Sequence, residues 1–316
     1  MTELHQTFLF KMVAEIYVQI DDIIKENREE VIRAMRHLDL IGRDYPTKLS
    51  LSEVMTLLIY YHHSGYKCFK SYYNDCVLYD LRRDFPDVVS YSHFVNLIPR
   101  ALVGLMFALA HQMKQSKSTG IYYGDSYPIP ACHPKRVHQH KVMRGFADWG
   151  KTSVGWFYGL KCHVVINHLG ELMSCTISSG SVADNDAGLL FRLTKELLGY
   201  FFGDKGYMLN EDKRNFLERD GELKFVTKVR KNMKKQNLEL EPKLWLKKRG
   251  VVESVIDIHK RHLEVAHTRH RSASHAFVNI FAGLVAYNFL QRKPSTKICI
   301  ERYLLRQAEK PLAIAA

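Results

Sequence analysis

The order of the predicted elements indicates an α/β (α+β) protein: a mixed five-stranded sheet flanked by helices, preceded by a small all-helical N-terminal domain. Up to about residue 118, apolar residues recur every three or four positions, as in residues 9–24 and 54–61, which is typical of amphipathic helices. Beyond residue 119, short apolar runs end at Gly or Asp, which is typical of strands. The 316 residues also exceed the roughly 100–200 residues of one typical domain.

The helical segment contains a clear start signal. Ser50 followed by Glu53 forms a capping box before an apolar run, and Gly65 helps to end that helix. Residues 50–77 have the size of a helix-turn-helix. Its candidate DNA-facing groups are Tyr66, Lys67, Lys70, Tyr72 and Tyr73. A plain helical bundle, or a dimerisation module, explains the same pattern equally well.

Apolar length argues against a membrane protein. The longest apolar stretches, Ala101–Ala110 and Val278–Leu290, are shorter than the ~20 residues of a spanning helix, so we interpret them as buried core helices. No basic patch followed by an apolar segment opens the chain, so no secretory signal is expected. Six scattered cysteines without a C-x-x-C pair predict reduced thiols in a cytoplasm.

The second half of the chain predicts three strands in a meander, then alternating helices and strands. The expected strands are 121–125, 155–167, 172–178, 200–203 and 223–229, with a hairpin turn at 168–170. A helix capped by Asp184 runs to Leu198, and another covers 211–218. This order is the one expected of a ribonuclease-H-like core, in which Asp125 lies on the central first strand and Asp204 ends the strand beside it.

Three acidic residues stand in distinctive settings. Asp125 and Asp204 each close an apolar strand, whereas Glu253 opens a helical run. Converging carboxylates with no cysteine cluster favour divalent-metal phosphoryl transfer, because Mg²⁺ takes oxygen ligands and leaves positions for substrate phosphate. Two ions roughly 3.5–4 Å apart then serve an in-line displacement, with Asp125 bridging both and the other two carboxylates holding one each.

The surroundings of Glu253 strengthen this interpretation. Arg249, Glu253 and Lys260 project from one helical face if a helix begins by Arg249, because a helix turns ~100° per residue. Arg and Lys beside a catalytic carboxylate suit DNA phosphates. The alternative is a set of surface ion pairs, which occurs on many helices.

At this point the chain resembles a DDE transposase of a bacterial insertion sequence. The family signature around its last acidic residue places Tyr, Arg, Glu and Lys at fixed spacing. Here the corresponding residues are Leu246, Arg249, Glu253 and Lys260, so the spacing matches and the tyrosine is replaced. Residues 124–126, 159–163 and 203–207 extend the resemblance over roughly residues 120 to 292.

The resemblance implies the roles of the site residues. Asp125, Asp204 and Glu253 are then catalytic metal ligands for two Mg²⁺ ions, for which Mn²⁺ substitutes. Arg249 and Lys260 contact DNA, and the turn residues Lys205 and Tyr207 either help to place DNA or simply form the turn. The implied partners are double-stranded DNA, as terminal inverted repeats and target, and a second copy of the chain in a synaptic homodimer; the implied location is the bacterial cytoplasm, at the nucleoid.

Charge supports a polyanionic partner independently of the resemblance. The net charge is +13, and residues 228–271 hold 13 Lys and Arg against five Asp and Glu. Lys247 and Lys248 belong to this basic stretch, where a phosphate backbone is expected to run. Within it, Trp245 either stacks on an extruded base or anchors the segment to the core, and we favour the anchor.

The predicted division of the chain follows. Residues 1–118 form a helical domain for DNA binding or dimerisation. Residues 119–292 form the catalytic domain with a basic insertion at about 230–248, and residues 293–316 form a C-terminal tail. A structural zinc site is not favoured, because the histidine pairs after Glu253 lack a cysteine pair. Two alternatives to transposition stay open: a degenerate protein that binds DNA without cutting it, and a nuclease or resolvase that never joins strands.

Overall fold

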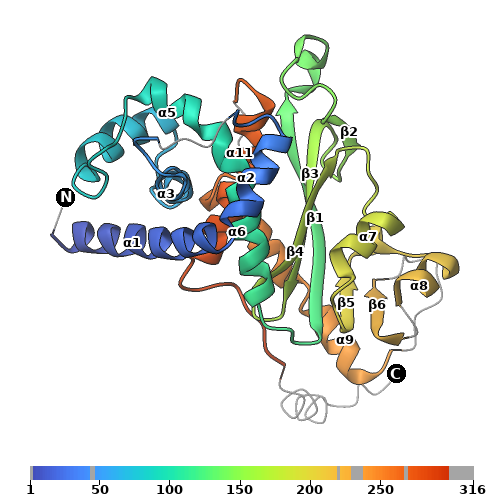
Figure 1. Ribbon diagram of the computed structural model, residues 1–316. Coiled ribbons are helices and arrows are strands. Elements are labelled where there is room, and N and C mark those ends of the chain that lie inside the picture. The colour runs from blue at the N-terminus through green and yellow to red at the C-terminus, as the bar shows by residue number, and fades with distance from the viewer. Residues whose placement is uncertain (1–2, 43–46, 219–220, 229–237, 267–269, 299–316) are drawn as a thin grey trace, which may run out of the picture.

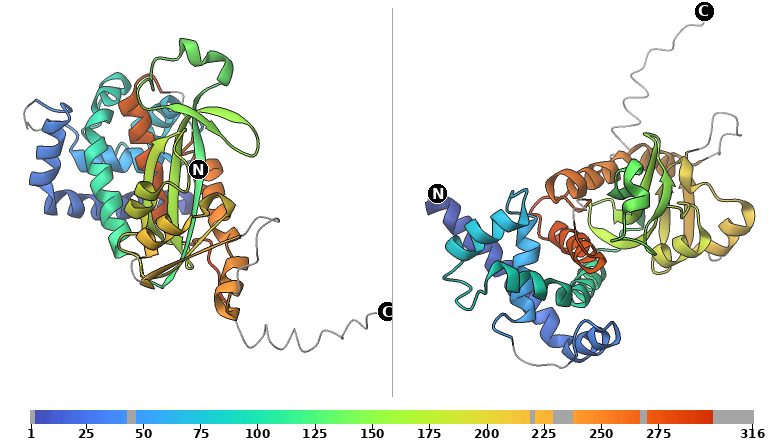
Figure 2. Two further views of the ribbon diagram at one scale, coloured as in Figure 1. Left: turned by 90° about the vertical axis from the view of Figure 1, so that its right-hand side faces the viewer. Right: turned by 90° about the horizontal axis from the view of Figure 1, so that it is seen from above.

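A helical part of the molecule lies beside a mixed sheet, as the computed structural model in Figure 1 shows. The structure describes residues 3–42, 47–218, 221–228, 238–266 and 270–298. The view from above in Figure 2 separates the helical part, which contains the N-terminus, from the strands and their covering helices. Part of the expected basic insertion (229–237) and most of the expected tail (299–316) lie outside the described residues.

Helices form the first part of the chain, as the apolar periodicity predicts. In order they are α1 (Glu3–Glu26), α2 (Arg28–His37), α3 (Leu51–Tyr61), α4 (Phe69–Ser71), the π-helix η1 (Tyr72–Asp80), α5 (Tyr91–Leu97), the 3-10 turn η2 (Ile98–Arg100) and α6 (Ala101–Gln115). The capping box at the start of α3 is confirmed. The Ser50 amide donates to Glu53 Oε2 at 2.6 Å, and the Glu53 amide donates to Ser50 Oγ at 3.2 Å.

Two tyrosines expected to face DNA are instead in the core. Tyr72 and Tyr73 are fully buried, and their hydroxyls donate to the carbonyls of Leu57 and Val89 at 2.9 and 2.8 Å. Their rings belong to an aromatic cluster, in which Tyr73 lies 4.7 Å from Phe94. The prediction that these tyrosines face DNA was therefore wrong, because their rings supply the apolar surface that joins η1 to α3 and α5.

The rest of the chain builds the sheet and its cover. The elements are β1 (Ile121–Cys132), the 3-10 turn η3 (Pro134–Gln139), β2 (Asp148–Lys151), β3 (Trp156–Asn167), β4 (Leu172–Ser179), α7 (Ala187–Thr194), β5 (Gly199–Gly203), the 3-10 turn η4 (Lys205–Tyr207), α8 (Glu211–Glu218), β6 (Leu223–Thr227), α9 (Leu240–Lys247), α10 (Gly250–Asp257), the π-turn η6 (Ile258–His262) and α11 (Ala273–Asn288). The sequence predicts most of these segments correctly, including the hairpin turn between β3 and β4.

The sheet is mixed, with strand order β2-β3-β1-β5-β6 and β4 paired to β3. Strand β1 is central, antiparallel to β3 and parallel to β5. This topology agrees with a ribonuclease-H-like core. The sequence missed the short strand β2, which makes the sheet six-stranded, and it predicted β1 seven residues too short. Both differences lie in polar or proline-containing sequence, where alternation is a weak signal.

Two clusters of buried apolar side chains hold the fold together. The larger cluster joins the N-terminal helices, α11 and one face of the sheet, and includes Tyr123, Tyr127 and Val252. The smaller cluster lies on the other face beneath α7 and α8, and includes Phe201 and Tyr207. Helix α11 contacts both α6 and α3, so the helical segment and the sheet share one core.

Among the described residues, one apolar stretch is long enough to cross a membrane. Tyr91–Gln115 meets the length and composition of a spanning helix, and half of its most apolar window is buried. In α6, Ala101, Leu105 and Ala108 are completely buried in the larger cluster. This part of the stretch therefore behaves as a core helix, as its sequence predicts.

Candidate active site

Strand pairing places Asp125 and Asp204 side by side. The last parallel pair between β1 and β5 joins Tyr123 to Phe202. Asp125 comes two residues after Tyr123, and Asp204 comes two residues after Phe202. Side chains two apart on a strand share a face, so the two carboxylates come to equivalent positions on neighbouring strands. Asp204 is also close enough to contribute to a raised pKa at Asp125.

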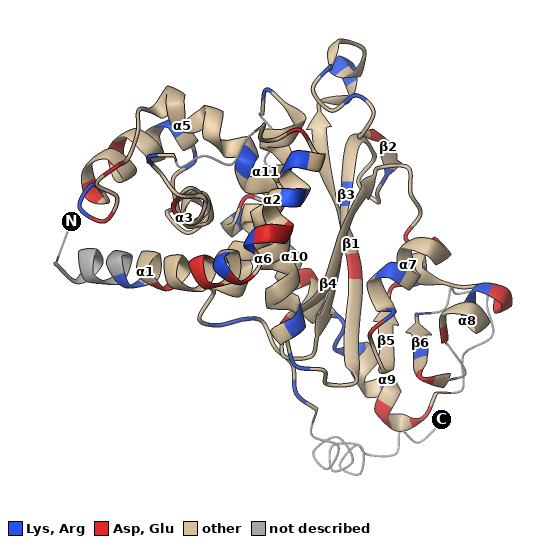
Figure 3. Ribbon diagram, viewed as in Figure 1, with Lys and Arg blue, Asp and Glu red and all other residues tan. Residues whose placement is uncertain are grey.

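A glycine permits this arrangement of strands. Gly124 precedes Asp125 on β1, and a Cβ at this position would overlap the Phe201 ring on β5. The missing side chain therefore leaves room for the Phe201 ring to lie over Gly124 on one face of the sheet. Figure 3 shows one acidic position on β1, the strand that α10 contacts.

Arg249 joins two of the predicted carboxylates. Its guanidinium donates to Asp125 Oδ2 at 3.1 Å through Nη1 and to Glu253 Oε1 at 2.8 Å through Nη2. The Arg249 side chain is only 8% exposed, whereas that of Glu253 is 64% exposed. Arg249 is the N-cap residue of α10, so the helix begins directly after it. The planar fork of arginine allows both contacts at once.

Burial and neighbouring charges act against each other at Asp125. Burial raises the pKa of Asp125, because it disfavours the charged carboxylate, while Arg249 and the Ser126 amide lower it. The amide of Ser126 donates to Asp125 Oδ1 at 2.9 Å. The carboxylate therefore depends on Arg249 for much of its compensation.

Asp204 begins a tight turn. Its Oδ1 accepts from the Gly206 amide at 2.6 Å, which caps the 3-10 turn η4. Lys205 points outward and is exposed, as a DNA contact requires. Tyr207 is 1% exposed and packs 5.7 Å from Phe201. The prediction that Tyr207 contacts DNA was therefore wrong for this conformation, and its alternative role of forming the turn fits.

The buried Tyr207 hydroxyl lies near the carboxylates. Burial raises the pKa of Tyr207, and Asp125, Asp184 and Asp204 raise it further. The hydroxyl has no hydrogen-bond partner among the described residues. A buried hydroxyl of this kind is available to a group that enters the site.

Asp184 is a fourth carboxylate that the sequence placed incorrectly. The residue that caps α7 is Asp186, whose Oδ1 accepts from the Leu189 amide at 2.8 Å. Asp184 Oδ1 instead accepts from Ser126 Oγ at 2.8 Å and from Lys161 Nζ at 3.4 Å. Two aspartates in Ala-Asp-Asn-Asp both suit a cap, and only the contact to β1 separates them.

Two residues of β3, Lys161 and His163, lie close to Asp184. Lys161 Nζ also donates to the Val182 carbonyl at 2.8 Å, and its side chain is 12% exposed. His163 is fully buried, with Nε2 2.8 Å from Ser178 Oγ and Nδ1 3.8 Å from Asp184 Oδ1. Burial lowers the pKa of His163 to about 4, so the ring is neutral near pH 7. Lys161 and His163 lie two positions apart on β3, so both face the same side of the sheet. This spacing of two polar residues can be seen in the sequence.

The basic candidates near Glu253 lie at the surface. Lys247, Lys248 and Lys260 are exposed. Lys260 lies in the π-turn η6, which directly follows α10. Trp245 serves as an anchor: it packs against the larger core cluster, and its carbonyl accepts from the Tyr123 hydroxyl at 3.2 Å.

The donor chemistry of the site suits a hard divalent cation. Asp125 and Asp204 offer carboxylate oxygens at neighbouring strand positions, as Mg²⁺ prefers. Among the residues that the structure describes, no three His, Cys, Asp or Glu side chains are grouped closely enough to hold a metal. Glu253 is directed at Arg249, so it has to turn away from the guanidinium to join the aspartates.

A match to a known family identifies the class of protein to which the chain belongs. Residues 115–273 match the family described as Transposase DDE domain. The chain belongs to this DDE transposase family. The match includes all three of its predicted acidic residues and both Arg249 and Lys260. Searches among curated proteins and among solved structures gave no match.

Membership gives the general activity of the chain. A DDE transposase acts on DNA in transposition and recombination, and this family generally uses divalent metal ions. The transposase domain thus accounts for the basic charge of the chain.

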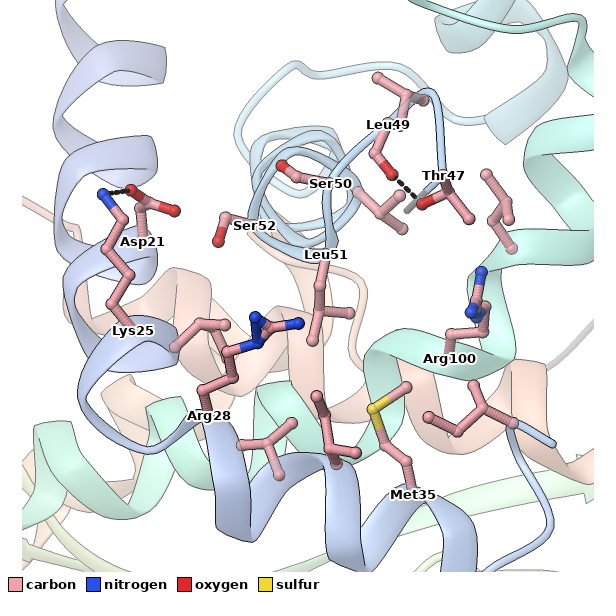
Figure 4. A pocket seen from close by; sticks show the side chains of 16 residues that line it. Asp21, Lys25, Arg28, Met35, Thr47, Leu49, Ser50, Leu51, Ser52 and Arg100 are labelled. Carbon is pink, nitrogen blue, oxygen red and sulfur yellow. Dashed lines mark hydrogen bonds and ion pairs between the residues drawn. The ribbon is translucent and has the colours of Figure 1, made fainter. Parts of the chain in front are cut away.

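One cavity among the described residues is remote from this chemistry. A cavity of about 350 Å³ lies among α1, α2, α3, the end of α5 and η2, and all the residues that line it precede Ala101. Figure 4 shows the ion pair of Lys25 with Asp21 at 2.6 Å on one side and Arg100 on the other. Its lining includes none of the carboxylates of the catalytic domain.

Proposed function

We propose that this transposase cleaves the ends of a bacterial insertion sequence and joins the freed 3′ hydroxyl to target DNA. The observation that carries the proposal is the single guanidinium of Arg249, which connects Asp125 on β1 to Glu253 on α10. This contact joins α10, which contains Glu253, to β1, and β1 pairs with β5, the strand that precedes Asp204. We infer that these three acidic residues, which come from distant segments of the matched transposase domain, meet when metal binds.

Asp125, Asp204 and Glu253 are the proposed metal ligands. Two bound Mg²⁺ ions, or Mn²⁺ in their place, would activate the attacking oxygen and neutralise the leaving one. Arg249 holds Asp125 ionised before the metal binds and then faces the scissile phosphate, because its fork suits phosphate oxygens. Lys205, Lys247, Lys248 and Lys260 contact the DNA backbone. Two transposon ends must be brought together, so we propose that a homodimer acts at the nucleoid, in the cytoplasm.

Strand-transfer assays on DNA with terminal inverted repeats test this proposal. Asp125→Asn, Asp204→Asn and Glu253→Gln should each abolish Mg²⁺-dependent cleavage while DNA binding persists. Asp257→Asn is a matched control, because Asp257 lies on the same helix and pairs with Arg261 at 2.7 Å. Near-normal cleavage by any one of the three variants would overturn the site.

The same assay separates the two alternatives. Cleavage without joining would identify a nuclease or resolvase of the same fold. DNA binding with neither reaction in Mg²⁺ or Mn²⁺ would identify a degenerate transposase. Imperfect inverted repeats flanking the gene would support the proposal without any assay.

A further inference from the structure

A basic and aromatic arm projects from the end of the sheet. The arm comprises residues 133–156, which connect β1 to β3 and include η3 and β2. Figures 1 and 2 show it extending beyond the other strands. It contains five Lys and Arg residues and one acidic residue, Asp148. All five cations are exposed: Lys135, Arg136, Lys141, Arg144 and Lys151.

The arm also exposes large aromatic side chains. Trp156 is 61% exposed, Phe146 50% and Trp149 40%. Two of the three tryptophans in the chain therefore lie on this arm in contact with solvent. Monomeric proteins normally bury such residues, and an exposed cluster of them marks a binding surface.

The arm is held in place at its base. Met143 is buried in the larger core cluster, and Phe146 packs 5.3 Å from Phe277 on α11. Trp149 packs edge-on to Tyr158 at 5.8 Å. The pairing of β2 with β3, from Asp148 with Gly159 to Lys151 with Trp156, fixes the end of the arm. The arm is thus a shaped surface, and its aromatic groups need little further ordering to bind a partner.

Charge identifies the partner as a polyanion. A second copy of the same arm carries the same excess of cations and repels the first, whereas a phosphate backbone attracts both. Cations that alternate with exposed aromatic rings are the pattern by which proteins bind unpaired nucleotides: the cations follow the phosphates, and the rings stack on the bases.

The position of the arm fits DNA that is held at the carboxylates. Strand β1 contains Asp125 and leads directly into the arm from Cys132, seven residues later. At about 3.3 Å per residue the two are roughly 23 Å apart along the strand. This is less than one turn of duplex DNA, about 34 Å.

We propose that this arm binds DNA next to the cleavage site, with its cations on phosphates and the Trp149 and Trp156 indoles on unpaired bases. The inference rests on the proposed function, and it assigns to the arm a preference for DNA with a single-stranded overhang over blunt duplex.

Equilibrium DNA binding tests the arm directly. Removing all five cations should lower the slope of log affinity against log salt by about 3.5 to 4.5, since each phosphate contact contributes about 0.7–0.9. Trp156→Ala should weaken overhang binding by about tenfold and blunt-duplex binding much less, because only unpaired bases offer their faces. Trp156→Phe keeps a ring and should retain most of the affinity.

A matched pair of lysines provides the control. Lys151 lies on β2, with its ammonium 5.6 Å from the Trp156 ring, and Lys224 lies on β6, 5.9 Å from the Tyr200 ring. These strands are at opposite ends of the sheet order. Lys151→Ala should weaken DNA binding by several-fold, and Lys224→Ala should not. Thermal melting confirms that each variant is folded.

The outcomes separate the arm from the proposed function. If the wild-type protein binds DNA and all arm variants bind it with the same affinity, the arm does not bind DNA. The transposase proposal would still stand. A change in oligomeric mass with unchanged DNA affinity would make the arm a subunit interface, which also overturns the inference. No DNA binding by the wild-type protein would overturn both.

Discussion

Arg249 and Asp125 form an ion pair at 3.1 Å although they are 124 positions apart in the chain. Arg249 is almost fully buried and Asp125 is 19% exposed, so neither charge is well solvated. Because the same guanidinium contacts Glu253, the pair fixes the signature helix against the central strand. The ion pair therefore holds Asp125 and α10 together before metal or DNA enters.

Removing Arg249 should damage both stability and cleavage. Arg249→Met leaves Asp125 buried without its cation, which should lower the free energy of unfolding by about 3 kcal/mol. Cleavage should fall by about 100-fold or more. Arg249→Lys should also fail, because an ammonium cannot contact two carboxylates in a planar fork. Chemical denaturation and cleavage assays measure the two effects; a fully active Arg249→Met protein would contradict this role.

A double variant checks the predicted loss of stability in the Arg249→Met protein. In the Arg249→Met protein, adding Asp125→Asn should restore part of the lost stability, because a neutral amide costs less to bury than an unpaired carboxylate. If the double variant is less stable by the sum of the two single effects, the two residues do not act as a pair.

Asp184 and Asp186 should differ in what they affect. Asp184→Asn removes the anionic partner of Lys161 and Ser126, so cleavage should fall about tenfold or more with little change in stability. Asp186→Ala removes the cap of α7, so the free energy of unfolding should fall by about 1 kcal/mol with cleavage retained. The two variants are each other's control, and the reverse pattern would refute the assignment.

Replacing a glycine by alanine should lower the stability of the protein on β1 and raise it on α10. Gly124→Ala places a methyl group in the Phe201 ring and should destabilise the protein by about 1–3 kcal/mol. Phe201→Leu should relieve part of this cost. Gly250→Ala meets no atom within 4 Å and lies in a helix, so it should stabilise by about 0.5–1 kcal/mol. Thermal melting of the three proteins gives the comparison.

Stability should fall in mild acid because buried histidines resist protonation. Burial lowers the pKa of His62 and His63 to about 4 and that of His259 to about 3. In the unfolded chain these groups titrate near 6.5, so as the pH falls below 6.5 the unfolded state gains protons that the native state does not take up. The neutral rings thus contribute stability at pH 7 that is lost between about pH 6.5 and 4.

Denaturation at a series of pH values measures this loss. Each buried histidine contributes a slope of up to about 1.4 kcal/mol per pH unit in that range. His37→Gln, at an exposed position on α2, should leave the slope unchanged. A flat profile between pH 7 and 5 would show that the native state accepts these protons.

Local sequence signals determined much of the fold. The capping box before α3, the hairpin turn between β3 and β4, and the strand containing Phe201 were all readable, because each depends on neighbouring residues. The same kind of signal placed Asp125 and Asp204 at strand positions. Their proximity followed from the order of strands in a parallel pair.

Tertiary structure alone decided which polar and aromatic groups are buried. Tyr72, Tyr73 and Tyr207 occur in polar surroundings in the sequence, and only packing against distant rings shows that they are core residues. The choice of Asp186 over Asp184 as the cap of α7 likewise depends on Ser126, 58 positions away from Asp184.

The sequence by itself thus determined most of the elements and the family signature, because these arise from spacing within a few residues. Only the tertiary structure decided that Arg249 joins Asp125 to Glu253 and that an exposed aromatic arm projects from β1. The physical reason is range. Propensity and capping act over one turn or one strand, whereas ion pairing and burial depend on which distant segments the completed fold brings together.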